Sequence, residues 1–291
     1  MSKFVRHKFL IAKTMKPFFL KLFSLVFVLF MSFTAKPPEF QGQAIYFSKS
    51  TMELGSWGAR MSEAQKKQVK ERLKNRLEKT YILNFNKEAS VFNEEDKLDA
   101  MSGATDSWGK NFARGEQYKN VKEDALVQTQ EFYGKKFLVK DKLQTFNWNM
   151  GSETKQIGQY MCFKASALVP TDELTWFDFS WAKMRRQQAQ KIDSTGTETP
   201  EIDMTQVVAW YTPQIPVSHG PAEYWGLPGL ILEVNAGNTT MLCSKIVMNP
   251  KEELKIEAPD KGKIVSKEEY QTTVMGKMKE MLDNRGRRRS R

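Results

Sequence analysis

Apolar and polar residues alternate in short runs along most of the chain after residue 40. In residues 80–86, the side chains of Tyr81, Leu83 and Phe85 occupy every second position, which is the period of a strand with one buried face. Such runs predict strands at residues 40–54, 80–86, 88–92, 118–123, 125–133, 136–140, 144–150, 160–167, 207–211, 230–234 and 239–248. Because helical stretches are missing between successive runs, the pattern favours antiparallel pairing over a parallel α/β arrangement.

Two other segments carry the signals of helices. Ser62 and Gln65 form a capping box, and an apolar stripe follows at i, i+4 spacing, which places it on one helix face that a sheet would cover. That stripe consists of Val69, Leu73 and Leu77. Ser266 and Glu269 form a second capping box and open a helix predicted to end near residue 283. The predicted fold class is therefore mainly β (α+β). We expect a large curved antiparallel sheet, half-barrel or sandwich-like, with one N-terminal and one C-terminal helix packed against it.

Interruptions of the strand pattern define the expected domain organisation. Residues 93–114 are polar with scattered glycine and aspartate, and they predict a loop. Residues 170–205 combine aromatic, polar helical and linker-like stretches, and they predict an exposed excursion between two strands. We expect a single antiparallel-sheet domain over residues 36–283, with separate segments at 1–35 and 284–291.

The first 35 residues have the pattern of a secretory signal peptide. Six basic residues and no acidic residue precede the apolar run Leu22–Phe33, and Thr34 and Ala35 end that run with small side chains. The alternative is a membrane anchor, but a span needs about 20 apolar residues and this run is shorter. We therefore expect an exported protein of the periplasm or outer cell envelope, with no membrane span in the mature chain.

The formal net charge of +11 gives a misleading picture of the folded part. Of 45 basic residues, six lie in the first 21 positions and five in the last seven, which leaves 34 bases against 34 acids. A nucleic-acid partner is not expected, because such binding needs basic groups gathered on one surface. The arginine-rich tail at residues 284–291 is read as a solvated end, with contact to phosphate, lipid headgroups or a partner as the alternative.

The chain has two cysteines, Cys162 and Cys243, each within an apolar strand-like run. In an exported protein an even pair predicts one disulfide, which would close a loop of about 80 residues. The alternative is a pair of buried thiols that act as small hydrophobic side chains.

Proline and glycine gather in residues 207–234 between two strand-like runs. The four prolines lack backbone donors, so this stretch cannot be a central strand throughout. Pro228 and Gly229 predict the middle of a type II turn, in which glycine supplies the positive φ. The candidate binding residues of this segment are Trp210, Tyr211, His219, Tyr224, Trp225, Leu227 and Pro228. They form either the rim of a ligand or partner site or a rigid crossover that plugs one end of the sheet.

The run Gly226–Ile231 reads Gly-Leu-Pro-Gly-Leu-Ile, the motif that names the GLPGLI family, a Porphyromonas-type family of envelope proteins of unknown function. The whole segment 207–234 resembles that family's signature, and residues 81–92 and 155–165 resemble its early hairpin and the block upstream of the signature. The resemblance implies an exported envelope protein typical of Bacteroidetes-type bacteria. It brings no catalytic residues with it.

Recognisable catalytic chemistry is scarce in the sequence. His7 and His219 are the only histidines, too few for a zinc site, and motifs for phosphate or dinucleotide binding are missing. No metal and no cofactor are expected. Ser218, His219 and Glu223 invite comparison with a hydrolase, but adjacent side chains of an extended chain point to opposite faces. We therefore do not expect an enzyme.

Two functional expectations remain. The first is a binding or carrier module for an apolar ligand held between a curved sheet and its helices, by analogy of fold alone. The expected lining is Phe85, Phe92, Phe132, Phe137 and Trp148. The second is an interaction or structural module of the envelope that docks another protein through residues 207–234, through the excursion or through the basic tail.

Overall fold

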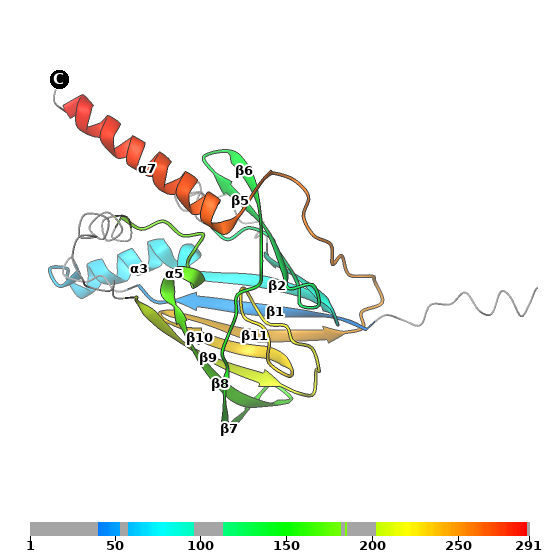
Figure 1. Ribbon diagram of the computed structural model, residues 1–291. Coiled ribbons are helices and arrows are strands. Elements are labelled where there is room, and N and C mark those ends of the chain that lie inside the picture. Colours follow the sequence, from blue (N-terminus) through cyan, green and yellow to red (C-terminus); the bar gives the residue numbers. More distant parts are fainter. Residues whose placement is uncertain (1–39, 53–57, 96–112, 182–183, 185–201, 290–291) are drawn as a thin grey trace, which may run out of the picture. The chain divides into compact units, whose positions relative to one another are not determined.

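The computed structural model describes residues 40–52, 58–95, 113–181, 184 and 202–289 (Figure 1). The predicted signal segment, most of the predicted loop at 93–114, most of the second half of the excursion and the last two residues of the basic tail lie outside these ranges.

The described residues form a mostly β structure built on one open, twelve-stranded mixed sheet. Its strand order is β12-β6-β5-β4-β3-β2-β1-β11-β10-β9-β8-β7. The strands are β1 (Gln41–Ser50), β2 (Glu78–Asn86), β3 (Ala89–Glu94), β4 (Gln117–Asn120), β5 (Ala125–Phe132), β6 (Lys135–Asp141), β7 (Asn149–Ile157), β8 (Tyr160–Pro170), β9 (Met204–Thr212), β10 (Leu230–Ala236), β11 (Thr239–Met248) and β12 (Lys263–Val265). The predicted mainly β fold is confirmed, and β12 adds a parallel pairing with β6 to an otherwise antiparallel sheet.

Local turn chemistry fixes two of the hairpins. The Asn86 side chain accepts hydrogen bonds from the backbone N–H groups of Glu88 and Ala89, which folds the chain from β2 into β3. Gly237 has a φ of 54° between β10 and β11, a conformation that glycine adopts without a side-chain penalty.

The predicted strand at residues 144–150 is wrong in its position, because β7 begins at Asn149 and the preceding residues are irregular. Phe146 and Trp148 stack on each other at 5.0 Å, and the Trp148 indole N–H donates to the carbonyl of Trp225 at 2.8 Å. Aromatic docking onto a distant segment therefore replaces the strand ladder that the local pattern predicts.

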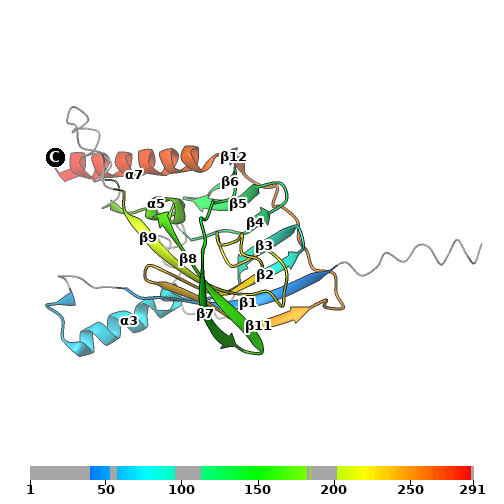
Figure 2. The ribbon, with the colours of Figure 1, turned by 60° about the horizontal axis from the view of Figure 1, so that its bottom comes forward.

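The labelled helices are α3 (Glu63–Leu77), α5 (Thr171–Leu174) and α7 (Lys267–Arg289). Both predicted capping boxes are present, at Ser62 with Gln65 and at Ser266 with Glu269. Helix α3 contacts β1 and β2, but it has no buried residue and its apolar stripe is only half-buried. Helix α7 packs on β6 (Figure 2) and continues to Arg289, past the predicted end near residue 283.

Two clusters of buried side chains form the core. The larger one joins β1, β2 and β8–β11 with the segment between β9 and β10. The smaller one lies between β5, β6 and α7, and its members are Phe132, Phe137, Val139, Trp176, Val265, Tyr270, Val274 and Met278. Helix α7 thus completes a second core rather than extending the first.

The predicted disulfide is not present, and Cys162 and Cys243 are buried free thiols. Cys162 lies in β8 and Cys243 in β11, with β9 and β10 between them. Each thiol is instead directed at a nearby backbone carbonyl, Cys162 at Tyr160 and Cys243 at Lys245. Burial raises the pKa of Cys162 to about 11 and that of Cys243 to about 12, so both thiols are protonated near neutral pH.

Candidate functional site

Residues 213–229 connect β9 to β10, which are adjacent antiparallel strands, and fold back over the inner face of the sheet. We keep the name crossover for this connecting segment. We use inner face for the side that carries the register partners Leu83, Phe92, Gln117, Gln128 and Val139 in neighbouring strands. The crossover is held to the start of β10, because Leu230 N–H donates to Ile215 and Ile231 N–H donates to His219. It therefore runs as a fixed loop rather than as a free one.

The predicted type II turn at Pro228 and Gly229 is wrong. Gly229 is not among the residues with positive φ, and its N–H donates to the carbonyl of Leu227 at 2.8 Å, closing a three-residue turn around Pro228. Glycine is required at this position by space, since a Cβ on Gly229 would lie 2.2 Å from the carbonyl oxygen of Thr212. The positive φ of the motif, 90°, belongs to Gly226.

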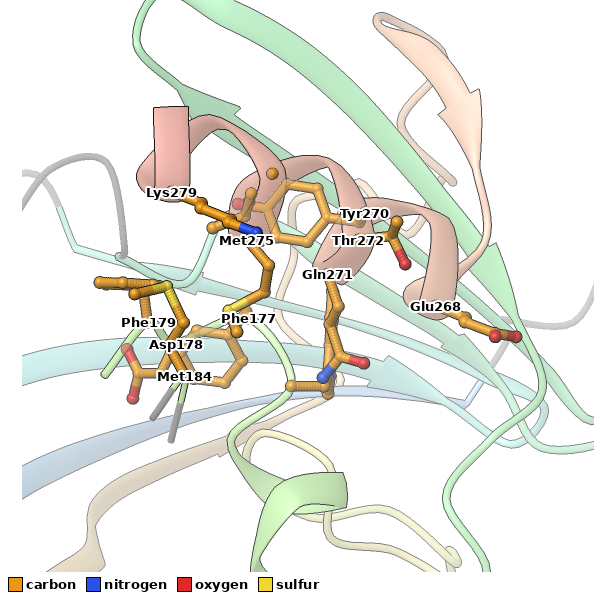
Figure 3. Close-up of a pocket in the computed structure, with 13 residues that line it drawn as sticks. Phe177, Asp178, Phe179, Met184, Glu268, Tyr270, Gln271, Thr272, Met275 and Lys279 are labelled. Atoms are coloured by element: carbon orange, nitrogen blue, oxygen red, sulfur yellow. The ribbon is translucent and has the colours of Figure 1, made fainter. Parts of the chain in front are cut away.

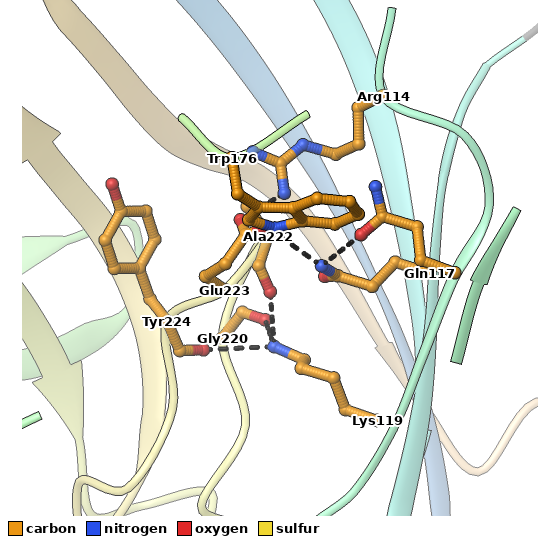
Figure 4. Close-up of polar contacts among 9 residues, drawn as sticks. Arg114, Gln117, Lys119, Trp176, Gly220, Ala222, Glu223 and Tyr224 are labelled. Atoms are coloured by element: carbon orange, nitrogen blue, oxygen red, sulfur yellow. Dashed lines mark hydrogen bonds and ion pairs between the residues drawn. The ribbon is translucent and has the colours of Figure 1, made fainter. Parts of the chain in front are cut away.

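A buried lysine on β4 holds the crossover in place. Lys119 is fully buried, and its ammonium group donates to the carbonyls of Gly220, Ala222 and Tyr224 at 2.8, 2.6 and 3.1 Å (Figure 4). Three acceptors saturate the three donors of an ammonium group. Burial lowers the pKa of Lys119 to about 7, an effect that the Glu223 carboxylate opposes and the Arg114 guanidinium reinforces.

Glu223, at the centre of the same loop, points its carboxylate into a second set of buried partners. It forms an ion pair with Arg114 and accepts hydrogen bonds from the Gln117 amide at 3.2 Å and from the Trp176 indole at 3.3 Å. Burial acts to raise the pKa of Glu223, but Arg114 together with Lys267 and Lys119 outweighs it and keeps the pKa below its ordinary value. The Arg114 guanidinium also lies over the Phe177 ring at 4.6 Å, a cation–π contact.

Polar side chains continue across the inner face of β3, β4 and β5, where core residues are usually apolar. Ser90, Gln117, Gln128 and Gln130 are each at most 2% exposed. The Gln117 amide N–H donates to Gln128 at 2.9 Å, but several polar atoms of this surface have no hydrogen-bond partner: Ser90 Oγ, Gln117 Oε1, Gln128 Nε2, Gln130 Nε2 and Gln130 Oε1. Such groups are rare in folded proteins and mark places that need an explanation. We call this set the glutamine cluster.

A hollow of about 390 Å³ opens beside this cluster, between α7 and the chain that follows α5. Figure 3 shows α7 side chains facing Phe177 and Met184 across it. Its apolar lining includes Trp176, Phe177, Phe179, Met184, Val274 and Met275, and polar groups such as Asp178, Glu268 and Lys279 complete the lining. We call it the α7 pocket. A volume near 400 Å³ with mainly apolar walls is within the range of small-molecule sites.

Two side chains lie between the α7 pocket and the buried polar region around the glutamine cluster. Trp176 lines the α7 pocket and donates to Glu223. Tyr270 also lines the pocket, its ring packs against Phe137 at 5.4 Å, and its buried hydroxyl has no hydrogen-bond partner. Phe137 is the register partner of Gln130. Trp176 and Tyr270 therefore separate the apolar hollow from the glutamine cluster.

The seven candidate residues of the crossover region do not form one surface. Trp210 and Tyr211 occupy opposite faces of β9, and Lys155 lies over the Trp210 ring at 4.4 Å. Tyr224 and Leu227 are buried in the larger core, Trp225 is half-buried with its indole donating to Gln144, and Pro228 is exposed. This arrangement favours the interpretation of the segment as a rigid crossover.

His219 is fully buried, and its Nε2 lies 3.1 Å from the carbonyl oxygen of Asn86. Burial, with a contribution from Lys119, lowers its pKa to about 3, so the imidazole is neutral. Its Nδ1 has no hydrogen-bond partner. A neutral imidazole whose Nε2 is directed at a backbone carbonyl is positioned as a packing group rather than as a base for Ser218.

The predicted carrier lining is largely packed into the core. Phe85 and Phe92 are fully buried in the larger cluster, Phe132 and Phe137 belong to the smaller one, and Trp148 is half-buried. Phe132 and Phe137 sit in the same cluster as three pocket-lining residues, Trp176, Tyr270 and Val274, and the pocket-lining Phe177 and Phe179 pack against that cluster. The pocket itself is built from α7 and the excursion, which the sequence did not identify as a lining.

Sequence reasoning missed Arg114, Gln117, Lys119, Trp176 and the two further glutamines of β5. One signal was available, because Leu126, Gln128, Gln130 and Phe132 share one face of a strand whose ends are apolar. Among the described residues, no group of three or more histidine, cysteine, aspartate or glutamate side chains is arranged to hold a metal ion. Over the same residues, no helix combines the length and apolarity needed to cross a bilayer.

The described residues thus form a mainly β protein with a fixed crossover and an apolar pocket beside α7. Residues 148–233, which include β7–β9 and the crossover, match a family described as a protein of unknown function, Porph_ging. The match supports a Porphyromonas-type family of unknown function over this part of the chain. No match is found among curated proteins.

Among solved structures, the chain is similar to PNGF-II in two crystal forms. The first, in space group C2, has a TM-score of 0.44 at 13% identity and covers 80% of this chain and 32% of PNGF-II. The second, in space group P21, has a TM-score of 0.41 at 13% identity and covers 78% and 31%. The chain thus spans about a third of the length of PNGF-II, and similarity at this level says nothing about activity.

Proposed function

We propose that the protein is an exported, non-catalytic binding module of the cell envelope that holds an apolar ligand in the α7 pocket. The observation that carries the proposal is the lining of that pocket, in which aromatic and thioether side chains from α7, from residues 176–179 and from Met184 face a hollow of about 390 Å³. Apolar walls around a concave space favour burial of an apolar molecule at about 25 cal/mol per Å².

Export is supported by the signal-like pattern of residues 1–35 and by the GLPGLI motif at Gly226–Ile231. A binding role is favoured over catalysis by the protonation and the hydrogen-bond partners of the buried ionisable side chains. His219 is neutral, both thiols are protonated, and Lys119 and Glu223 are occupied by structural partners.

The alternative of an envelope interaction module that docks through residues 207–234 finds less support. Most side chains of the crossover are buried, and its exposed positions are mainly small or cyclic, such as Pro213, Pro216 and Pro228. Interfaces depend on a few large anchoring side chains, and the crossover presents only part of Trp225 to solvent.

Native mass spectrometry of the protein purified from its own host, followed by solvent extraction, tests the proposal. We expect extra mass that extraction releases as an apolar compound. A Met275→Glu variant should lose that mass, because it places a charge in the pocket wall, whereas Thr273→Glu, which adds the same charge outside the pocket on the same helix, should retain it. Bare protein in every preparation, or equal retention by both variants, would refute the α7 pocket as the binding site.

A further inference from the structure

The inner wall of the α7 pocket borders a buried polar region that has more hydrogen-bonding capacity than the described chain uses. Behind Trp176 and Tyr270 lie Gln117, Gln128 and Gln130, whose amides leave four polar atoms without partners. The Tyr270 hydroxyl adds a fifth. A buried polar group without a partner is destabilising, so a cluster of them beside a pocket points to a ligand group that completes the hydrogen bonds.

Charge indicates the nature of that group. Arg114 and Lys119 are cations held in the buried region, and among the described residues Glu223 is the only buried carboxylate. Lys267, whose charge also acts on Glu223, lies nearby at the start of α7, with its ammonium group 5.8 Å from the Trp176 ring. With a pKa of about 7, Lys119 is partly protonated near neutral pH, and Arg114 is paired with Glu223, so the buried groups carry a partial net positive charge. The exposed Asp178, whose carboxylate acts on Tyr270 from the pocket wall, opposes it. A partial positive charge among buried groups favours an anion over a cationic group.

The unpaired donors fit a carboxylate. Gln128 Nε2, Gln130 Nε2 and the Tyr270 hydroxyl are N–H or O–H donors, and an ionised carboxylate accepts about four hydrogen bonds. The apolar walls of the α7 pocket require the remainder of the same molecule to be hydrocarbon. Trp176 lines the pocket and donates one hydrogen bond of 3.3 Å to Glu223, so binding of one molecule to both regions requires its indole to turn aside.

We propose that the ligand of the α7 pocket is a fatty-acid-like amphiphile whose carboxylate is bound by the glutamine cluster and Tyr270 and whose hydrocarbon chain occupies the pocket. This inference rests on the proposed function and adds the chemical class of the ligand. It assigns to Gln130, a residue outside the family match and outside the crossover, the role of binding the head group.

Calorimetric titration of the full, delipidated chain with decanoate and with decanol tests the inference, since the two probes differ only in the head group. We expect decanoate to bind at least about tenfold more tightly, as expected for one or two hydrogen bonds to a charged group. Gln130→Leu should reduce decanoate binding to the level of decanol and leave decanol binding unchanged. Gln206→Leu, which alters an exposed glutamine on β9, should change neither.

Stability distinguishes this role from a structural one. Removing a buried amide that has no partner should leave the unfolding midpoint of Gln130→Leu at or above that of the unaltered chain. Should this variant fail to fold, Tyr270→Phe removes a single hydroxyl from the same region and should weaken decanoate binding alone. Equal affinity for the two probes, or a preference that survives both substitutions, would overturn the head-group assignment and leave the α7 pocket standing. Binding of neither probe would overturn both proposals.

Discussion

Replacing Lys119 with methionine tests whether the buried lysine holds the crossover in place. The substitution keeps an unbranched side chain of similar length but leaves the carbonyls of Gly220, Ala222 and Tyr224 without their donor. Each unsatisfied buried acceptor costs about 1–3 kcal/mol. The cost of burying the lysine cation disappears in the variant, and this offsets part of the loss from the three carbonyls. We expect the free energy of unfolding to fall by about 3–5 kcal/mol.

Urea denaturation followed by tryptophan fluorescence measures this loss, and Lys122→Met is the matched control. Lys122 lies on the same stretch of chain and pairs with Glu88, but its side chain is 67% exposed, and exposed pairs contribute at most about 1 kcal/mol. Hydrogen exchange gives a local readout, because the N–H groups of Leu230 and Ile231 donate to the crossover and should lose protection. If Lys119→Met costs no more than Lys122→Met, the role assigned to Lys119 is refuted.

Three further predictions follow from other buried groups. The pKa of His219 is about 3 in the folded chain against about 6.5 unfolded, so the unfolded state takes up a proton first and the free energy of unfolding should drop by about 4–5 kcal/mol as pH falls from 6.5 to 3; His219→Gln should show a shallower slope in acid titrations, and equal slopes would contradict the assignment. Gly229→Ala should lower the free energy of unfolding in urea more than Gly237→Ala, because a Cβ at position 229 would lie 2.2 Å from the carbonyl oxygen of Thr212, whereas a Cβ at position 237 meets no atom. The reverse order would show that the backbone shifts at Gly229 with little loss of stability. Without reductant, iodoacetamide should label Cys162 and Cys243 only after unfolding in urea, whereas no labelling after unfolding would reveal a disulfide.

Most strands follow from the sequence because their information is local. Tyr81, Leu83 and Phe85 alternate with their neighbours, and that period alone places them on the inner face of β2. The two capping boxes depend on residues three positions apart, and both are found as predicted. β12 was missed because three residues are too few to show a period, and its parallel pairing with β6 depends on a partner 126 positions earlier in the register.

The candidate site was harder to predict because its partners come from distant parts of the chain. Lys119 reads as a solvent-facing strand residue until the crossover, 101–105 positions later, covers it with three carbonyls. Gln128 and Gln130 read as polar alternation for the same reason. The wrong turn at Gly229 has a different origin, since Pro-Gly predicts a positive φ from dihedral preference alone, while the close approach of Thr212 depends on how β9 and β10 pair.

The double anchoring of the crossover has a consequence for how the protein opens. Two buried side chains hold the crossover to the sheet from opposite sides. Lys119 belongs to the sheet and donates hydrogen bonds to the crossover, whereas Glu223 belongs to the crossover and contacts Gln117 of the sheet and Arg114 beside it. A partial opening of the crossover would separate Lys119 and Glu223 from their partners before water could solvate either charge. The crossover is therefore expected to detach in one step together with its strands, so that this region behaves as a single cooperative unit and local breathing is confined to other parts of the chain.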